Sequence, residues 1–393
     1  MVRVDGPKLL PGRSLVCVLG GRVQEYGVTR LDGLCDVVFV PFYALPKGGD
    51  TLLNDGHRIT QEVLEAAAKS ATTTYGIHVP LGKVSQVMTD LKQKSALQRM
   101  KNYWMKNNIY HYGVLDLHVG KNGTTASDAA GRVFALLKEF RHAQNNIRRE
   151  SEVASKHHRA AYVVLGVRSL LATNGQLFKT LEEHARSFVV SAFIFRTHIS
   201  DSEASTPHYG CKVNGPAPYK IKNSKHFMGM ADAVSYARKF SWARNTTLAV
   251  SFTLCTHRYR PQKELHIGAE CSRDAKRKTT AITSSALCSE RPDFYANQAI
   301  DKIQHTAYSW RKPDVVATYD TADTMRWKIC SLEKTHRHLK LSVALFDAEC
   351  EDWRGKCARP STSHMRGSDR MRKLHAFLRQ LSRRGNNSSR ACP

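Results

Sequence analysis

Short apolar runs alternate along this chain with longer stretches in which apolar residues recur at helical spacing. Eight of the runs have the length and near-continuous hydrophobicity of strands that are buried on both faces. They lie at residues 15–20, 36–42, 75–81, 113–119, 161–167, 188–195, 247–254 and 341–346. Helices are predicted at residues 61–70, 95–108 and 128–141, and a last amphipathic helix at 369–384. Strands separated by helices indicate parallel β-α-β units.

Eight such units are the number that closes a barrel, so the predicted fold class is α/β, a (β/α)8 TIM barrel. An open, doubly wound sheet is the structural alternative, but Gly20, Gly21 and Arg22 do not form a glycine-rich dinucleotide motif after the first strand. The segment at about 200–313 is rich in Ser, Thr, Pro, Gly and charge. We expect a long irregular loop or a small insertion there, before the last strand. The barrel is expected to span residues 14–385, with a basic tail at 386–393.

The chain has ten cysteines and no Cys or His spacing typical of a zinc site. We therefore expect disulfides, with buried free thiols as the alternative, and neither a metal nor a cofactor. Disulfides favour an extracellular location, although residues 1–19 do not form a clear signal peptide. No run of about 18 uncharged apolar residues indicates a membrane span.

The formal net charge of +26 predicts attraction to polyanions such as heparin-like glycans and nucleic acid. The positive charge is densest at the end of the chain, where residues 353–393 hold eleven Lys or Arg and a single acid, Asp369. A solvated basic face with a basic tail is the alternative. The helix at 369–384 is expected to pack on the core through its apolar side.

Three segments of the chain carry a family resemblance. The first is residues 15–44, with Cys17 in the first strand and Cys35 just before the second. The second is residues 103–120, a helix followed by the fourth strand. The third is residues 314–357, where a Tyr-Asp pair, a helix, an apolar strand and an acidic turn follow one another. Together they resemble the family-18 glycoside hydrolases, and in particular the chitinase-like proteins of arthropods. The resemblance implies a Cys17–Cys35 disulfide and a site at the C-terminal ends of the barrel strands.

The family carries a DxxDxDxE motif on its fourth strand, and here the chain departs from the family. Gly113 replaces the first Asp, Asp116 keeps the second and His118 replaces the third. Gly120 replaces the Glu that protonates the leaving group, while in the family the substrate's own acetamido group is the nucleophile. Glycine has no proton to give, and general acid catalysis contributes roughly 10²–10⁴ in rate. The resemblance therefore implies a barrel that has lost its catalytic acid.

Five residues are candidate binding residues: Asp116, His118, Phe193, Phe195 and Asp347. We expect Asp116 and His118 to form a hydrogen-bonded pair, with His118 as a substitute acid the alternative. Phe193 and Phe195 stand in the sixth strand where the family has a Tyr-Asp pair. Asp347 follows the eighth strand. The alternative for this last segment is a solvated acidic turn that comprises Asp347, Glu349, Glu351 and Asp352.

Three functions are compatible with the sequence. The one we favour is a secreted, non-enzymatic chitinase-like protein that binds chitin-type or other glycans, or a protein. The second is an active hydrolase of chitin or N-acetylglucosamine oligomers that uses a non-standard acid. The third is a protein that binds polyanions, heparin-like glycans or nucleic acid, through its basic surface.

Overall fold

The structure, a computed structural model, describes most of the chain. The described residues are 8–20, 31–41, 58–118, 126–150, 160–168, 174–200, 211–222, 227–240, 245–271, 280–289, 297–336, 339–358, 364–384 and 392. Within these ranges no helix is both long enough and apolar enough to cross a membrane.

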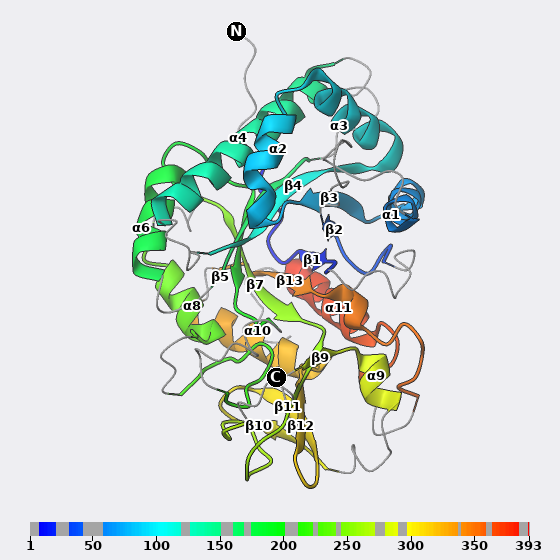
Figure 1. Cartoon of the computed structure of the whole chain (residues 1–393), viewed down its shortest axis with the longest axis vertical. Helices are drawn as coiled ribbons and strands as arrows, with labels where there is room; N and C mark the ends of the chain where they lie inside the picture. Colours follow the sequence, from blue (N-terminus) through cyan, green and yellow to red (C-terminus); the bar gives the residue numbers. More distant parts are fainter. Residues whose placement is uncertain are drawn as a thin grey trace.

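Eight parallel strands close into a barrel, which confirms the predicted fold class (Figure 1). The ring closes where the last strand pairs with the first, with Val16 beside Ala344, and this closure excludes the open sheet. Each predicted strand overlaps an observed one. In chain order the barrel strands are β1 (Leu15–Val18), β2 (Val37–Pro41), β3 (Thr74–His78), β4 (Ile109–Leu117), β5 (Val163–Arg168), β6 (Ala192–Arg196), β7 (Thr247–Thr253) and β13 (Ser342–Phe346).

Helices cover the outside of the barrel (Figure 1). They are α1 (Arg58–Lys69), α2 (Val84–Asp90), α3 (Lys94–Asn107), α4 (Ala126–Arg149), α6 (Asn174–Ala185), α8 (Met230–Ala237), α10 (Ala322–Thr335) and α11 (Asp369–Arg384), with short 3-10 turns η3 (Leu81–Lys83) and η9 (Ala348–Cys350). Local chemistry sets some of their ends. Helix α3 stops at Asn108, which adopts the left-handed conformation that Asn tolerates, and Thr321 caps α10 by accepting from the main-chain N–H of Thr324.

A second, smaller sheet follows the C-terminal end of β7 and lies at the bottom of Figure 1. Its antiparallel strands run in the order β10-β11-β12-β8-β9. Their bounds are β8 (Thr256–Tyr259), β9 (Thr280–Ile282), β10 (Gln298–Asp301), β11 (Thr306–Arg311) and β12 (Val315–Tyr319), and helix α9 (Ser284–Ser289) follows β9. The sequence predicted only an irregular loop or a small insertion here, because these strands are only three to six residues long.

The barrel strands are buried on both faces. Inside the barrel, side chains such as Val16, Phe39, Leu115 and Ile194 pack on one another. The outer faces pack against the surrounding helices in a larger apolar layer. This burial on two sides explains why the strands are almost continuously apolar in sequence. Because the interior is filled, the accessible polar positions of the barrel lie at the strand ends.

Every cysteine of the chain is in a disulfide, so the alternative of free thiols is wrong. Cys17 and Cys35, whose pairing the family resemblance implied, are bonded with their Cα atoms 6.0 Å apart. The other pairs are Cys211–Cys271, Cys255–Cys350, Cys288–Cys357 and Cys330–Cys392. Most of these bonds link the inserted sheet or the last helices to segments that are distant in sequence.

Candidate functional site

Strand β4 carries the predicted motif positions Gly113 and Asp116 towards the mouth of the barrel, the end where the parallel strands finish. In a regular strand, residues three apart point to opposite faces. Between Val114 and Leu117, however, the register with β5 shifts as in a β-bulge. Gly113 therefore lies beside the interior residue Val164, and Asp116 still reaches the mouth. The bulge explains how a motif with three-residue spacing can place both positions on the inner side.

Gly113 has no room for a side chain, because an added Cβ would lie 2.7 Å from the main-chain oxygen of Val164. We expect Gly113→Asp, which restores the first acid of the family motif, to lower the free energy of unfolding by about 1–3 kcal/mol. Urea unfolding followed by circular dichroism measures this. The control is Gly82→Asp, where nothing lies within 4 Å of the added Cβ. If both variants unfold like the wild type, β4 accommodates the side chain and the expectation is wrong.

Asp116 is the centre of a charged cluster at the mouth. Arg168, the last residue of β5, donates from Nε and Nη2 to the two carboxylate oxygens at 2.5 and 2.6 Å. Arg196, the last residue of β6, donates to the same carboxylate. Burial alone would raise the pKa of Asp116, but Arg196 and Arg168 hold it well below its usual range. Asp116 is therefore ionised throughout the physiological pH range.

His118 lies next to Asp116, as the sequence predicted, but its hydrogen bond is to the main chain. Its Nδ1 is 2.9 Å from the main-chain oxygen of Asp116 and 3.9 Å from the carboxylate Oδ2. A carbonyl oxygen can only accept, so Nδ1 carries the hydrogen. In the neutral ring the other nitrogen, Nε2, is then a proton acceptor rather than a donor.

Two more histidines lie near Asp116. Burial lowers the pKa of His78, the last residue of β3, to about 4. Burial also lowers the pKa of His198 far below its ordinary value. The Nδ1 of His198 is 2.7 Å from Ser251 Oγ, and its ring centroid is 4.5 Å from that of Phe346. Both imidazoles are neutral at physiological pH, so neither is the imidazolium that a general acid requires there.

The opposite side of the mouth carries carboxylates. Asp347, directly after β13, accepts a hydrogen bond from Thr253 Oγ1 at 2.6 Å. Glu349 accepts one from the main-chain N–H of Gly20 at 2.9 Å. Because β13 stands across the ring from β4, the mouth has Asp116 with its two arginines on one side and these two acids on the other.

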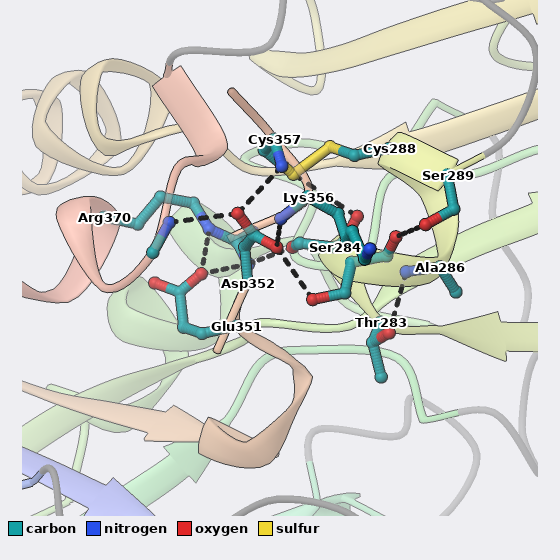
Figure 2. Close-up of a disulfide and its surroundings, with 12 residues drawn as sticks. Thr283, Ser284, Ala286, Cys288, Ser289, Glu351, Asp352, Lys356, Cys357 and Arg370 are labelled. Atoms are coloured by element: carbon teal, nitrogen blue, oxygen red, sulfur yellow. Dashed lines mark hydrogen bonds and ion pairs between the residues drawn. A yellow bond between two sulfur atoms is a disulfide. The ribbon is translucent and has the colours of Figure 1, made fainter. Parts of the chain in front are cut away.

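The turn after β13 is not solvated, and this corrects the alternative drawn from the sequence. Glu349, Glu351 and Asp352 are 2%, 0% and 0% exposed. Asp352 accepts from Ser285 Oγ at 2.7 Å and from two main-chain N–H groups of the following turn at 2.8 and 2.9 Å (Figure 2). The hydrogen-bond donors to these buried acids come from residues distant in sequence or from the main chain of the turn itself. An acidic composition does not reveal such partners.

Glu351 is paired with Arg370 of α11, and both side chains are completely buried. Arg370 Nε donates to Glu351 Oε2 at 2.8 Å (Figure 2). The other nitrogens of Arg370 donate to Ser284 Oγ and to the main-chain oxygens of Leu254 and Asp320. The disulfide Cys288–Cys357 lies beside this cluster. The cluster joins the last helix, the acidic turn and the inserted sheet, so its acids serve the fold.

Phe193 and Phe195 do not line the mouth, which corrects their place among the predicted binding residues. They are 2% and 1% exposed and lie in the apolar layer between the barrel and the helices. The ring of Phe195 is 5.8 Å from that of Phe178 in α6. Alternate residues of a strand share a face, and on β6 the inward face is the one that ends with Arg196.

The candidate residues predicted from the sequence did not include the two arginines of the cluster. Arg168 and Arg196 are register partners on neighbouring strands. Each is a charged residue that directly ends an apolar strand, and in a parallel barrel that position faces the mouth. This signal was available without any motif.

Gly120, which the resemblance aligns with the family's catalytic Glu, lies outside the described residues, which stop at His118 in this segment. Of the predicted basic tail, the structure describes Cys392 alone, which is bonded to Cys330 of α10.

No protein-family model matches this chain, and no curated protein is significantly similar to it in sequence. Solved structures share its fold. Human YKL-39, described as a pseudo-chitinase with retained chitooligosaccharide-binding properties, superposes with a TM-score of 0.64 at 12% identity, over 92% of this chain and 98% of that one. Ostrinia furnacalis Group IV chitinase in complex with allosamidin gives 0.65 at 13% identity, over 93% and 99%.

A chitinase-like agglutinin from Robinia pseudoacacia gives a TM-score of 0.62 at 12% identity, over 93% of this chain and 100% of that one. These similar structures include a chitinase and a pseudo-chitinase, so the shared fold does not decide between catalysis and binding. A family-18 N-acetylglucosaminidase from Paenibacillus barengoltzii superposes with a TM-score of 0.63 at 10% identity, over 92% and 99%. The chain therefore has the chitinase-like barrel fold of glycoside hydrolase family 18.

Proposed function

We propose that this protein is a non-hydrolytic chitinase-like barrel that binds a glycan at its mouth. The observation that supports this best is the pairing of Asp116 with Arg168 and Arg196. Asp116 is the acid of the motif that the chain keeps, and a carboxylate held ionised by two guanidinium groups cannot donate a proton to a leaving group.

The rest of the motif supports the same proposal. Gly120 offers no side chain where the family has its acid. His78 and His198 are neutral at physiological pH, and the His118 Nδ1 hydrogen is directed to a carbonyl oxygen. Hydrolysis with His118 as acid is the alternative function, and it requires the imidazolium form of that ring.

Glycan binding is supported by the polar groups that the mouth offers. Asp116, Arg168 and Asp347 supply donors and acceptors from opposite sides of the ring. Sugar hydroxyl groups are recognised by such hydrogen bonds within a concave site. Binding without hydrolysis is what the description of human YKL-39 states for that protein, and the shared fold supports its extension to this one as a proposal. The five disulfides support an extracellular location.

The test compares turnover of a fluorogenic chitobioside by the wild type, Gly120→Glu, and Gly120→Glu combined with His118→Asp. We expect no release above buffer from any of them, because the groups that orient the acetamido group act as a unit with the acid. Wild-type turnover that His118→Ala abolishes would show an enzyme with a histidine acid. Wild-type turnover that survives His118→Ala would show an acid elsewhere, and either result refutes the proposal.

Binding is measured on the same proteins by calorimetry with N-acetylchitohexaose. We expect Asp116→Asn to weaken binding roughly tenfold, because a charged hydrogen-bonding partner at the mouth is lost. The matched control is Asp323→Asn on α10, which makes the same charge change at a side chain that is 84% exposed. Equal binding by both variants and the wild type would place the glycan away from the mouth.

A further inference from the structure

A groove beside α11 is separate from the mouth and carries three arginines. It encloses about 540 Å³, and we call it the α11 groove. Its lining residues are Gly33, Arg372, His375, Ala376, Arg379, Gln380 and Arg383. Gly33 lies in the loop that leads into β2, so the groove is at the end of the barrel where the strands begin. It is therefore opposite to the mouth, and binding there is independent of the proposed function.

The arginines of the α11 groove form a stripe along the helix. Arg372, Ala376, Arg379 and Arg383 are spaced four, three and four residues apart, which places them on one side of α11. The positions span about 16 Å at the rise of an α-helix. The short side chain of Ala376 leaves space between the neighbouring cations, so the stripe is suited to an extended anion.

Packing of α11 does not require these cations, because the helix is anchored by the apolar residues on its other side: Met371, Leu374, Phe377, Leu378 and Leu381. The helix dipole favours cations in the last turn, which accounts for Arg383, but it disfavours Arg372 near the first turn. Arg372 forms an exposed pair with Asp369 at 2.6 Å. Neither Arg379 nor Arg383 forms a salt bridge with any residue that the structure describes.

The acid nearest the floor of the α11 groove already has partners. Asp36 Oδ1 is 3.2 Å from His375 Nε2, and Asp36 Oδ2 accepts from the main-chain N–H of Leu15 at 2.8 Å. The lining residues themselves include no acid. Arg379 interacts electrostatically with Asp36, but no acid lies among the lining residues, so the groove presents a net positive charge to solvent.

We propose that the α11 groove binds a linear sulfated glycan. Guanidinium groups bind oxyanions through paired hydrogen bonds, and a row of them matches a chain that carries repeated anionic groups. The net charge of +26 attracts such a chain from a distance. Five disulfides indicate an oxidising, extracellular compartment, where the polyanion at hand is a sulfated glycan rather than nucleic acid.

The experiment measures binding of a heparin octasaccharide by calorimetry at several salt concentrations. The test variant combines Arg372→Gln, Arg379→Gln and Arg383→Gln. The control variant combines Arg132→Gln, Arg149→Gln and Arg186→Gln, which removes the same charge from exposed positions outside the groove. We expect the test variant to bind about tenfold more weakly or worse, and the slope of log affinity against log salt to fall by about two to three. The control should stay within about twofold of the wild type.

Thermal unfolding of both variants shows whether they are folded. Equal weakening in the two triple variants would mean that net charge alone attracts the glycan, and it would overturn the proposal. If the protein bound single-stranded DNA of matched charge more tightly than it binds the octasaccharide, the proposal of a sulfated glycan as the ligand would be wrong. The groove triple variant should bind neutral N-acetylchitohexaose as well as the wild type does, because the mouth is at the other end of the barrel. Loss of that binding would contradict the independence of the two sites.

Discussion

Replacing Arg370 by methionine is expected to lower the free energy of unfolding by about 3–5 kcal/mol, which is a large part of the stability of an ordinary domain. The substitution leaves the Glu351 carboxylate buried without its cation, since both side chains are 0% exposed. It also removes the donor to Leu254, Asp320 and Ser284, whose oxygens lie in three different segments. Urea unfolding of the oxidised protein, followed by circular dichroism, measures the change.

Two controls separate the loss of the buried charge pair from the loss of a long side chain. Arg372→Met, two residues along the same helix, changes a side chain that is 63% exposed and should alter stability by no more than about 1 kcal/mol. The double variant Arg370→Met with Glu351→Gln should recover part of the loss, because no unpaired charge remains buried. If the double variant were less stable than the single one, the argument from the uncompensated carboxylate would be wrong.

Replacing Lys328 by methionine is expected to have a comparable effect at neutral pH. Lys328 Nζ donates to Asp320 Oδ1 at 2.5 Å and to the main-chain oxygen of Ala217 at 2.6 Å, and the charged pair is fully buried. Burial raises the pKa of Asp320 even with Lys328 beside it. Without Lys328 this pKa rises further, so we expect a loss of about 3–5 kcal/mol at pH 7.

The pH dependence identifies the cause. A carboxyl group whose pKa is higher in the folded state than in the unfolded state stabilises the fold when it is protonated, and that contribution is lost as the pH rises through the folded value. The deficit of Lys328→Met should therefore shrink as the pH is lowered from 7 towards 5, as Asp320 takes up a proton. Adding Asp320→Asn should flatten this dependence. A deficit that stays constant from pH 5 to pH 8 would point to lost packing rather than to a stranded charge.

The barrel could be predicted from the sequence because each of its strands is buried on two sides. Double burial makes a strand such as β13 an uninterrupted apolar run, and this signal needs no knowledge of its neighbours. The inserted sheet could not be predicted in this way. Its strands are three to six residues long and differ in burial, from β10, which has no buried position, to β12, which is buried throughout. One of its pairs, β12 with β8, also joins segments that are far apart in sequence.

The mouth could be predicted only in part. Asp116, His118 and Asp347 follow from strand ends and from the motif. Phe193 and Phe195 were predicted at the mouth from the family alignment, although alternate residues of β6 point to opposite faces and these two lie on the outer one. The buried acids of the turn after β13 could not be predicted, because their partners come from helix α9, from α11 and from main-chain groups of the turn. Charge in a sequence does not reveal whether a distant partner will remove it from water.

The closure of the ring has a consequence for synthesis. The main-chain N–H of Ser14 bonds to Ser342 Oγ across a separation of 328 positions, next to the pairing of β1 with β13. At typical translation rates, β1 waits on the order of 15 to 65 seconds for this neighbour to leave the ribosome. Cys17 and Cys35, only 18 positions apart, can be joined early, whereas each of the other four cysteine pairs needs a residue from Cys271 or later. Until then the nascent half-barrel exposes open strand edges, and oxidation in that interval decides whether the late cysteines find their own partners.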